Sequence, residues 1–205
     1  AIRGRGTIDG WGHHFRRDTV DGKRGNAPYF YEGDKTKRAR LIMGLKAEDC
    51  RVEGVTLRNP TFWTTHIAGS KGFNFTDVKV YSNYRINNDG LNYDGCTDST
   101  IDNCAMITGD DSHCLKNEYM DGLGGPNERI RVANSIMTGF PKGVKFGWAF
   151  HQARDVTYDN IRMVQSNFGM DAGIKPIRAA GPKIAEIVNV TIKDSVIDHG
   201  VSMKV

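Results

Sequence analysis

The stretch "VEGVTL", residues 52–57, is the first clear copy of a six-residue pattern that recurs along the chain. The pattern reads apolar, any residue, then Gly, Asp or Asn, then small or apolar, any residue, and apolar again. Its other copies are "FTDVKV" (75–80), "IDNCAM" (101–106), "VANSIM" (132–137), "YDNIRM" (158–163) and "IKDSVI" (192–197). Internal repetition of this kind predicts a stack of similar coils in which each coil packs on its neighbours.

The third position of every copy holds a residue that readily enters the left-handed backbone region. Such a residue between two short apolar runs predicts a corner that turns the chain from one strand into the next. These pivot residues are Gly54, Asp77, Asn103, Asn134, Asn160 and Asp194, and successive pivots lie 23, 26, 31, 26 and 34 residues apart.

The segments around the pivots are rich in Val, Ile, Phe and Thr and alternate apolar with polar residues, as half-buried strands do. A β-sandwich is also built from short strands, but its tight two-residue hairpin turns are scarce in this sequence. We therefore predict an all-β fold, a single-stranded right-handed parallel β-helix, with residues 1–205 in one domain and rungs about 4.8 Å apart. Neither terminus carries a clear cap, which is consistent with a fragment lacking one or both end caps.

The composition narrows the class of partner. Of the 205 residues, 39% are hydrophobic and 25% are charged, which suits a domain with a substantial core. The net charge of +4 fits an acidic polymer without requiring one. The basic cluster "GDKTKRAR" (33–40) is interpreted as a solvated loop rather than a nucleic-acid patch. No apolar run approaches the roughly 20 residues that span a bilayer, so we expect no membrane segment.

The four cysteines are Cys50, Cys96, Cys104 and Cys114, and they lack the paired C-x-x-C spacing of a zinc site. We interpret them as small buried thiols, while a bridge between Cys96 and Cys104 stays open as the alternative.

Two acidic segments are equivalent positions on neighbouring coils. When "NDGLNY" (88–93) is laid over "DDSHCL" (110–115), Asp89 falls beside Asp111 at roughly one rung, about 5 Å. Asp110 precedes Asp111 and shares the same surface. Three carboxyl groups that close cannot all ionise cheaply, so we expect the cluster to retain one proton near neutral pH.

One protonated acid beside ionised carboxylates is what glycoside hydrolysis requires. A separation of about 6.5 to 9.5 Å between acid and base leaves room for water and gives inversion at the anomeric carbon. A calcium site and a merely solvated surface are the two other interpretations of the same carboxylates.

Four segments occur in the order and spacing seen in polygalacturonases: "GRGTIDGWG" (4–12), "VEGVTLRNPTFWTTHI" (52–67), "NNDGLNYDG" (87–95) and "TGDDSHCLKN" (108–117). From about residue 4 to 197 the chain resembles the clan of inverting glycoside hydrolases that holds the polygalacturonase family and the dextranase/isopullulanase family. The resemblance implies that Asp110 is the general acid and that Asp89 and Asp111 activate the attacking water. It also implies a polysaccharide substrate, no organic cofactor, no metal, and a secreted or periplasmic location.

Two departures from the polygalacturonase pattern leave the substrate open. Lys142, in "PKGVKFG" (141–147), stands where polygalacturonases carry the histidine of Gly-His-Gly. Polygalacturonases also bind the substrate carboxylate with Arg-Ile-Lys, and only "AGIKPIR" (172–178) is available to match it. Lys175 stands either at the position of the Lys, or at that of the Arg with Arg178 displaced nearby. Arg is the better bidentate ligand for a carboxylate, so these departures weaken the case for galacturonate. Both an acidic uronate and a neutral α-glucan therefore stay open as substrates. The stretch "VKFGWAFHQARDVTYDNI" (144–161) resembles the dextranase/isopullulanase side of the clan.

The predicted substrate-binding residues are Asn88, His113, Lys142, Lys175, Arg178 and Trp148. Trp63 is a second candidate sugar platform, and Lys116 is either a solvated lysine or a ligand contact. The rival functions are a calcium-dependent polysaccharide lyase of similar architecture and a non-catalytic carbohydrate-binding solenoid. The oligomeric state is left open by the sequence.

Overall fold

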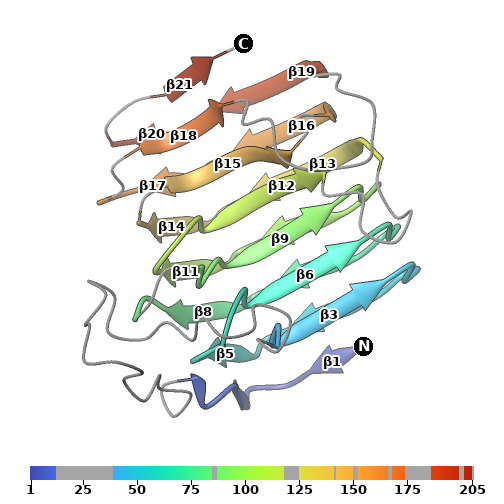
Figure 1. Cartoon of the computed structure of the whole chain (residues 1–205), viewed down its shortest axis with the longest axis vertical. Coiled ribbons are helices and arrows are strands. Elements are labelled where there is room, and N and C mark those ends of the chain that lie inside the picture. Colours follow the sequence, from blue (N-terminus) through green and yellow to red (C-terminus); the bar gives the residue numbers. More distant parts are fainter. Residues whose placement is uncertain are drawn as a thin grey trace, which may run out of the picture.

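The structure is a computed structural model that describes residues 1–12, 39–84, 87–117, 125–140, 142–149, 152–165, 168–173, 186–198 and 201–204. These residues form 21 strands in three sheets, and no helix among them is long and apolar enough to cross a membrane. The strands are stacked coil upon coil from β1 near the N-terminus to β21 near the C-terminus (Figure 1).

Each sheet contains seven strands, and every third strand along the chain belongs to the same sheet. Sheet A contains β1 (Ile2–Arg3), β4 (Arg51–Glu53), β7 (Asn74–Thr76), β10 (Thr100–Asp102), β13 (Asn127–Ala133), β16 (Gln152–Asp159) and β19 (Glu186–Lys193). Sheet B contains β2 (Thr7–Asp9), β5 (Thr56–Arg58), β8 (Lys79–Ser82), β11 (Ala105–Thr108), β14 (Ile136–Gly139), β17 (Arg162–Met163) and β20 (Val196–Ile197). Sheet C contains β3 (Ile42–Leu45), β6 (Thr65–Ala68), β9 (Leu91–Asp94), β12 (His113–Asn117), β15 (Lys142–Ala149), β18 (Phe168–Gly173) and β21 (Val201–Lys204).

All neighbouring strands within the sheets pair in parallel, as in β9 with β12 and β12 with β15. This arrangement confirms the predicted parallel β-helix and rules out the antiparallel pairing of a β-sandwich for the described strands. That the 205 residues form a single domain stays a prediction.

The predicted corner residues all adopt the left-handed backbone conformation, between a strand of sheet A and a strand of sheet B. Their φ angles are 75° at Gly54, 56° at Asp77, 51° at Asn103, 50° at Asn134, 52° at Asn160 and 51° at Asp194. Side-chain amides link successive coils: Asn103 Nδ2 donates to Asp77 Oδ1 at 2.5 Å, and Asn160 Nδ2 donates to Asn134 Oδ1 at 2.9 Å. The repeat therefore marks a stacked column of polar corners.

Inside the solenoid, apolar side chains from equivalent positions lie above one another. One row in sheet A consists of Val52, Phe75, Ile101, Val132 and Tyr158, which are each at most 1% exposed. Cys96, Cys104 and Cys114 are free, buried thiols, and burial raises the pKa of each to about 12. These three confirm the interpretation as buried thiols, and Cys50 is free as well but partly buried.

Sheet C differs from the other two sheets in the character of its outer face. Ile67, Tyr93 and Leu115 point into the core from three neighbouring strands. Because side chains alternate along a strand, the residues directly before and after each of them turn outward. The outward residues include His66, Asn92, Asp94, Lys116 and Lys145, and all five are buried. Burial of this many polar groups along one face of one sheet identifies where the chain gathers its reactive side chains.

Candidate active site

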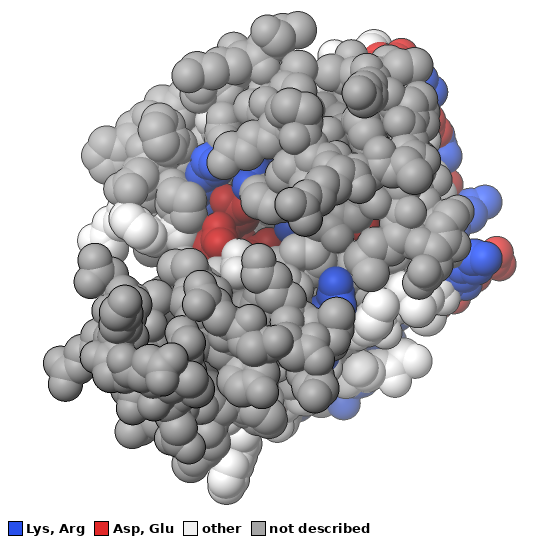
Figure 2. Space-filling view, viewed as in Figure 1, with Lys and Arg blue, Asp and Glu red and all other residues white. Residues whose placement is uncertain are grey.

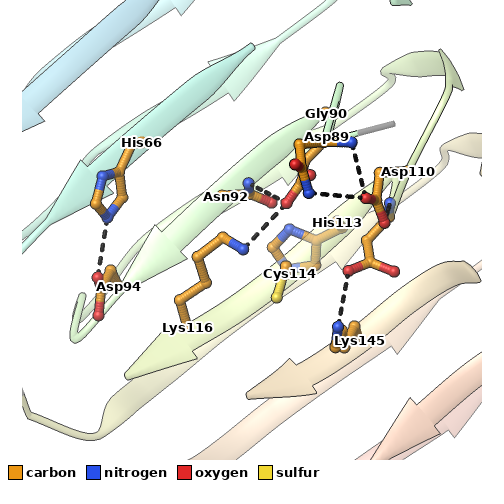
Figure 3. Close-up of polar contacts among 12 residues, drawn as sticks. His66, Asp89, Gly90, Asn92, Asp94, Asp110, His113, Cys114, Lys116 and Lys145 are labelled. Atoms are coloured by element: carbon orange, nitrogen blue, oxygen red, sulfur yellow. Dashed lines mark hydrogen bonds and ion pairs between the residues drawn. The ribbon is translucent and has the colours of Figure 1, made fainter. Parts of the chain in front are cut away.

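The register of sheet C brings the two acidic segments side by side. His113 pairs with Leu91 and Leu115 pairs with Tyr93, and the Gly90 N–H donates to the Asp111 carbonyl at 2.9 Å. This is the register predicted from the sequence. Figure 3 shows Asp89 and Asp110 just before β9 and β12, and Lys145, which pairs with Asp111, on the neighbouring strand β15. Asp89, Asp110 and Asp111 are called the acidic trio below.

Two glycines allow the coils around the trio to approach closely. A Cβ on Gly90 would lie 2.2 Å from the Ser112 carbonyl oxygen. A Cβ on Gly139 would lie 2.0 Å from the Lys142 carbonyl oxygen and 2.9 Å from that of Asp110. Since real Cβ atoms do not approach backbone oxygens so closely, the trio depends on glycine at both positions.

Asp89 is held by two donors from sheet C. Its Oδ2 accepts a hydrogen bond from Asn92 Nδ2 at 3.0 Å and pairs with Lys116 Nζ at 3.0 Å (Figure 3). Asp89 is only 2% exposed. The Lys116 ammonium and the Asn92 amide therefore fix the position of the Asp89 carboxyl group through one oxygen.

Asp111 is equally buried, at 2% exposure, and pairs with Lys145 Nζ through Oδ2 at 3.3 Å. Its other oxygen, Oδ1, has no hydrogen-bond partner among the described residues. Burial and the neighbouring Asp89 charge raise the pKa of Asp111 to about 7, against the lowering effect of Lys145. A carboxyl group with this pKa exchanges a proton near neutral pH.

Asp110 is the most accessible member of the trio, being half-buried. Its Oδ2 accepts from the Asn87 N–H at 2.9 Å, and its Oδ1 accepts from the Asp111 N–H at 3.0 Å. Within the described part of the chain no Lys or Arg lies at ion-pair distance from it. Burial and then the charge of Asp89 raise the pKa of Asp110, so the trio retains a proton above the pH at which an ordinary Asp loses it.

Trp63 fixes the position of Lys116. The Lys116 Nζ lies 3.9 Å from the Trp63 ring centroid, and Phe62 stacks on Trp63 with centroids 4.6 Å apart. Trp63 is 7% exposed. The ring is therefore part of the support for Lys116 by a cation–π contact and not an open sugar platform.

His66 and Asp94 form a second buried pair on the same outer face. His66 Nε2 lies 2.9 Å from Asp94 Oδ2, and the two side chains are 0% and 2% exposed (Figure 3). Burial lowers the pKa of His66, and Asp94 opposes this shift. Figure 2 shows acidic and basic side chains together in a hollow over the region of β9 and β12.

Two predicted substrate contacts are turned away from the trio. Asn88 is fully buried, and its Nδ2 donates to the carbonyls of Pro60 and Phe62, at 3.1 and 2.8 Å. His113 is also fully buried and packs on the core residue Tyr93 with ring centroids 5.8 Å apart. Burial lowers the pKa of His113 to about 4, so the ring is neutral at ordinary pH. The structure thus gives both residues supporting positions, and the expectation that they line the cleft is not met.

Lys142 begins β15, and its carbonyl accepts from the Ser112 N–H at 3.1 Å. It therefore lies opposite Asp111 on the next coil, as its match to the family histidine implies, but other lysines pair with the trio. Lys175, Arg178 and the side chain of Trp148 lie outside the described residues. The register places Asp171 opposite Lys145 on the following coil.

Sequence reasoning missed Asn92 and Lys145 and left Lys116 undecided. A usable signal was present for each lysine. Lys116 lies 22 residues after Asp94, the same interval that separates Asp111 from Asp89. Lys145 lies 31 residues after Cys114, which is the interval between the pivots Asn103 and Asn134. Within the described residues, no three His, Cys, Asp or Glu side chains are placed to share a metal ion.

The parallel β-helix and its acidic trio define a solenoid with the architecture of polysaccharide-cleaving hydrolases, as the sequence predicted. The model for glycosyl hydrolases family 28 matches residues 1–204, and the chain belongs to this family. A probable polygalacturonase from Vitis vinifera is 30% identical over 120 residues, which cover 56% of this chain and 24% of that protein. The family membership confirms the resemblance to polygalacturonases.

The solved structure of a hyperthermoactive exopolygalacturonase from Thermotoga maritima superposes with a TM-score of 0.52 at 20% identity. The superposition covers 81% of this chain and 41% of that one, and it supports the shared fold. The chain spans less than half the length of either relative.

Proposed function

We propose that this chain carries the catalytic site of an inverting glycoside hydrolase that cleaves an α-linked polyuronate of the pectin type. The observation that carries the proposal is the acidic trio, three neighbouring carboxyl groups beside the outer face of sheet C, of which Asp110 and Asp111 have raised pKa values. Both relatives are named as polygalacturonases, which supports the choice of substrate class. Action on such a polymer agrees with the predicted secreted or periplasmic location.

The roles within the trio follow from access and pairing. Asp110 is the most exposed carboxyl group and is the one without a lysine partner among the described residues, so it donates its proton to the glycosidic oxygen. Asp89 and Asp111 are each paired with a lysine and act as the carboxylates that orient and deprotonate the attacking water. Attack by this water opposite the leaving group inverts the anomeric carbon.

The test is reducing-end release from polygalacturonate, dextran, pullulan and rhamnogalacturonan, each with calcium and with a chelator. We expect calcium-independent release from polygalacturonate. Asp110→Asn should lower this rate by about 10²- to 10⁴-fold, since general acid catalysis contributes on that order. The matched control is Asp49→Asn, at an exposed aspartate of the β3–β4 turn, which should keep the wild-type rate.

Each other outcome points to a named alternative. Release from dextran or pullulan alone would move the substrate to neutral α-glucans. A calcium-dependent product that absorbs in the ultraviolet would establish a lyase. Binding to a polymer without release of reducing ends would establish a binding solenoid. Full activity in the Asp110→Asn protein would overturn the assignment of the general acid.

A further inference from the structure

Two lysines are buried beside the acidic trio, which is an unusual place for this side chain. Lys116 is 3% exposed and Lys145 is 8% exposed. Lysine is almost never buried to this extent unless a counter-charge holds it there. Here each lysine has its own carboxylate, Asp89 at 3.0 Å and Asp111 at 3.3 Å.

The lysines come from consecutive strands of sheet C and point outward toward the same cluster (Figure 3). Lys116 on β12 faces Asp89 and the Trp63 ring, and the buried pair His66 and Asp94 lies beside it. Lys145 on β15 faces Asp111, with Cys114, Asp110 and Lys116 nearby. Burial is the largest influence and lowers the pKa of Lys145, but Asp111, Cys114 and Asp110 together outweigh it, so the pKa of Lys145 is raised. The ammonium therefore stays protonated throughout the range in which the trio titrates.

The charges determine how many protons the trio can hold. Three ionised carboxylates and two ammonium groups leave a net charge of −1, and a single retained proton makes the buried cluster neutral. If one ammonium were lost, neutrality would need a second proton. That proton would occupy one of the two carboxylates that must be ionised to activate water.

We propose that Lys116 and Lys145 are positioning residues that restrict the acidic trio to one shared proton and hold Asp89 and Asp111 as the carboxylates facing the water. This inference rests on the proposed function for its catalytic meaning. The restriction on proton number is a property of the protein itself and is open to test without turnover.

The experiment is a carboxyl ¹³C NMR titration of the three aspartates in wild type, Lys116→Met, Lys145→Met and Lys193→Met. Methionine removes the charge and keeps the length of the side chain. Lys193 is the matched control because its Nζ also pairs with an aspartate, Asp159, at 3.2 Å, but on the outer face of sheet A. In the Lys145→Met protein the trio should take up its second proton at least about one pH unit higher, since a close opposite charge shifts a carboxyl pKa by about 1 to 3 units.

The pH profile of polygalacturonate hydrolysis gives a second reading. The acidic limb of the profile of kcat against pH should move to higher pH by about one unit or more in Lys116→Met and in Lys145→Met. It should stay in place in Lys193→Met. Lys145→Arg should return the limb toward its wild-type position, because it restores the charge. A uniform loss of kcat at every pH, with an unmoved limb, would reduce the lysines to structural supports and overturn the inference.

The NMR arm separates the two proposals. If no polymer is hydrolysed, the proposed function fails, yet the titration still decides the role of the lysines. If the Met variants do not fold, the wild-type titration alone is decisive, because it must show no more than one protonated trio member at about pH 6. Two protonated carboxyl groups at that pH would overturn the inference.

Discussion

Asp111 and His113 are two residues apart, yet their side chains lie on opposite sides of sheet C. Asp111 pairs with the outward-facing Lys145, whereas His113 packs on Tyr93 in the core. Burial raises the pKa of Asp111 to about 7 and lowers that of His113 to about 4, because it disfavours the charged form of each. The two shifts have opposite consequences for stability.

Between about pH 4 and 7 the folded trio retains a proton, shared between Asp110 and Asp111, that the unfolded chain releases, so the trio makes stability fall as the pH rises. Between about pH 4 and 6.5 the unfolded chain holds a proton on His113 that the folded state rejects, so this group makes stability rise with pH. The two effects oppose each other over most of the same window and flatten the wild-type profile.

We predict that Asp111→Asn removes the opposing pH dependence and leaves that of His113. Its free energy of unfolding should rise with pH from about 4.5 to 6.5 more steeply than that of wild type, by up to about 1.4 kcal/mol per pH unit. Urea denaturation at three pH values in this window measures the slope. Asp49→Asn, the exposed control, should run parallel to wild type. Parallel curves for Asp111→Asn and wild type would show that Asp111 carries no raised pKa in the folded protein.

At the scale of a structural element, the corner between sheets A and B combines a special backbone conformation with a side-chain contact. Asn134 has a φ of 50°, its Nδ2 donates to Asp102 Oδ1 at 2.8 Å, and its Oδ1 accepts from Asn160 Nδ2 at 2.9 Å. The side chains are exposed, so each hydrogen bond contributes little, whereas the left-handed conformation costs roughly 1 kcal/mol or more for a residue other than Gly, Asn or Asp.

We therefore expect Asn134→Ala to lower the free energy of unfolding by about 1 to 3 kcal/mol. Asn134→Gly should cost less, because glycine adopts this conformation without a steric penalty. Lys79→Ala, an exposed substitution on β8, should change the free energy of unfolding by no more than about 0.5 kcal/mol. Denaturant unfolding compares the three proteins. Equal losses in the Ala and Gly variants would assign the stability of the corner to the side-chain hydrogen bonds instead.

These corners explain how much of the fold the sequence could predict. Gly54, Asp77 and Asn103 stand at a fixed place between two apolar runs, and their backbone preference acts locally, so the coil was predictable from single copies of the repeat. The same spacing placed Asp89 beside Asp111. It did not show which way a polar side chain turns once it is buried.

His113 illustrates this limit. A histidine next to an Asp pair suggests a residue that lines the cleft. His113, however, pairs in register with Leu91, and both side chains face the core. Lys145 illustrates the converse, since nothing in its neighbours along the chain distinguishes it from a solvated lysine. Its counter-charge comes from Asp111 on the preceding coil, so the ion pair appears only after the coils are stacked.

On the scale of the whole molecule, the strands of sheet C beside the trio are among the most buried of the described strands. Every residue of β9 and β12 is buried, and β12 pairs with β9 on one side and β15 on the other. Toward the C-terminal end of the stack, β19 has no buried residue. Because the stability of a solenoid is approximately a sum over neighbouring coils, the trio lies on the part of the chain that is hardest to open.

This gradient predicts the pattern of hydrogen exchange in the 205-residue chain. Amides of β13 should exchange at least about tenfold more slowly than those of β19, which corresponds to about 1.4 kcal/mol of additional opening free energy. The two strands are a matched pair, because both belong to sheet A and are of similar length, 7 and 8 residues. Peptide-resolved exchange read by mass spectrometry measures the difference, with β9 and β12 expected at the slow extreme. Uniform rates along the stack would mean that the chain opens in a single cooperative step, in which case the burial around the trio would give the site no local rigidity beyond that of the whole solenoid.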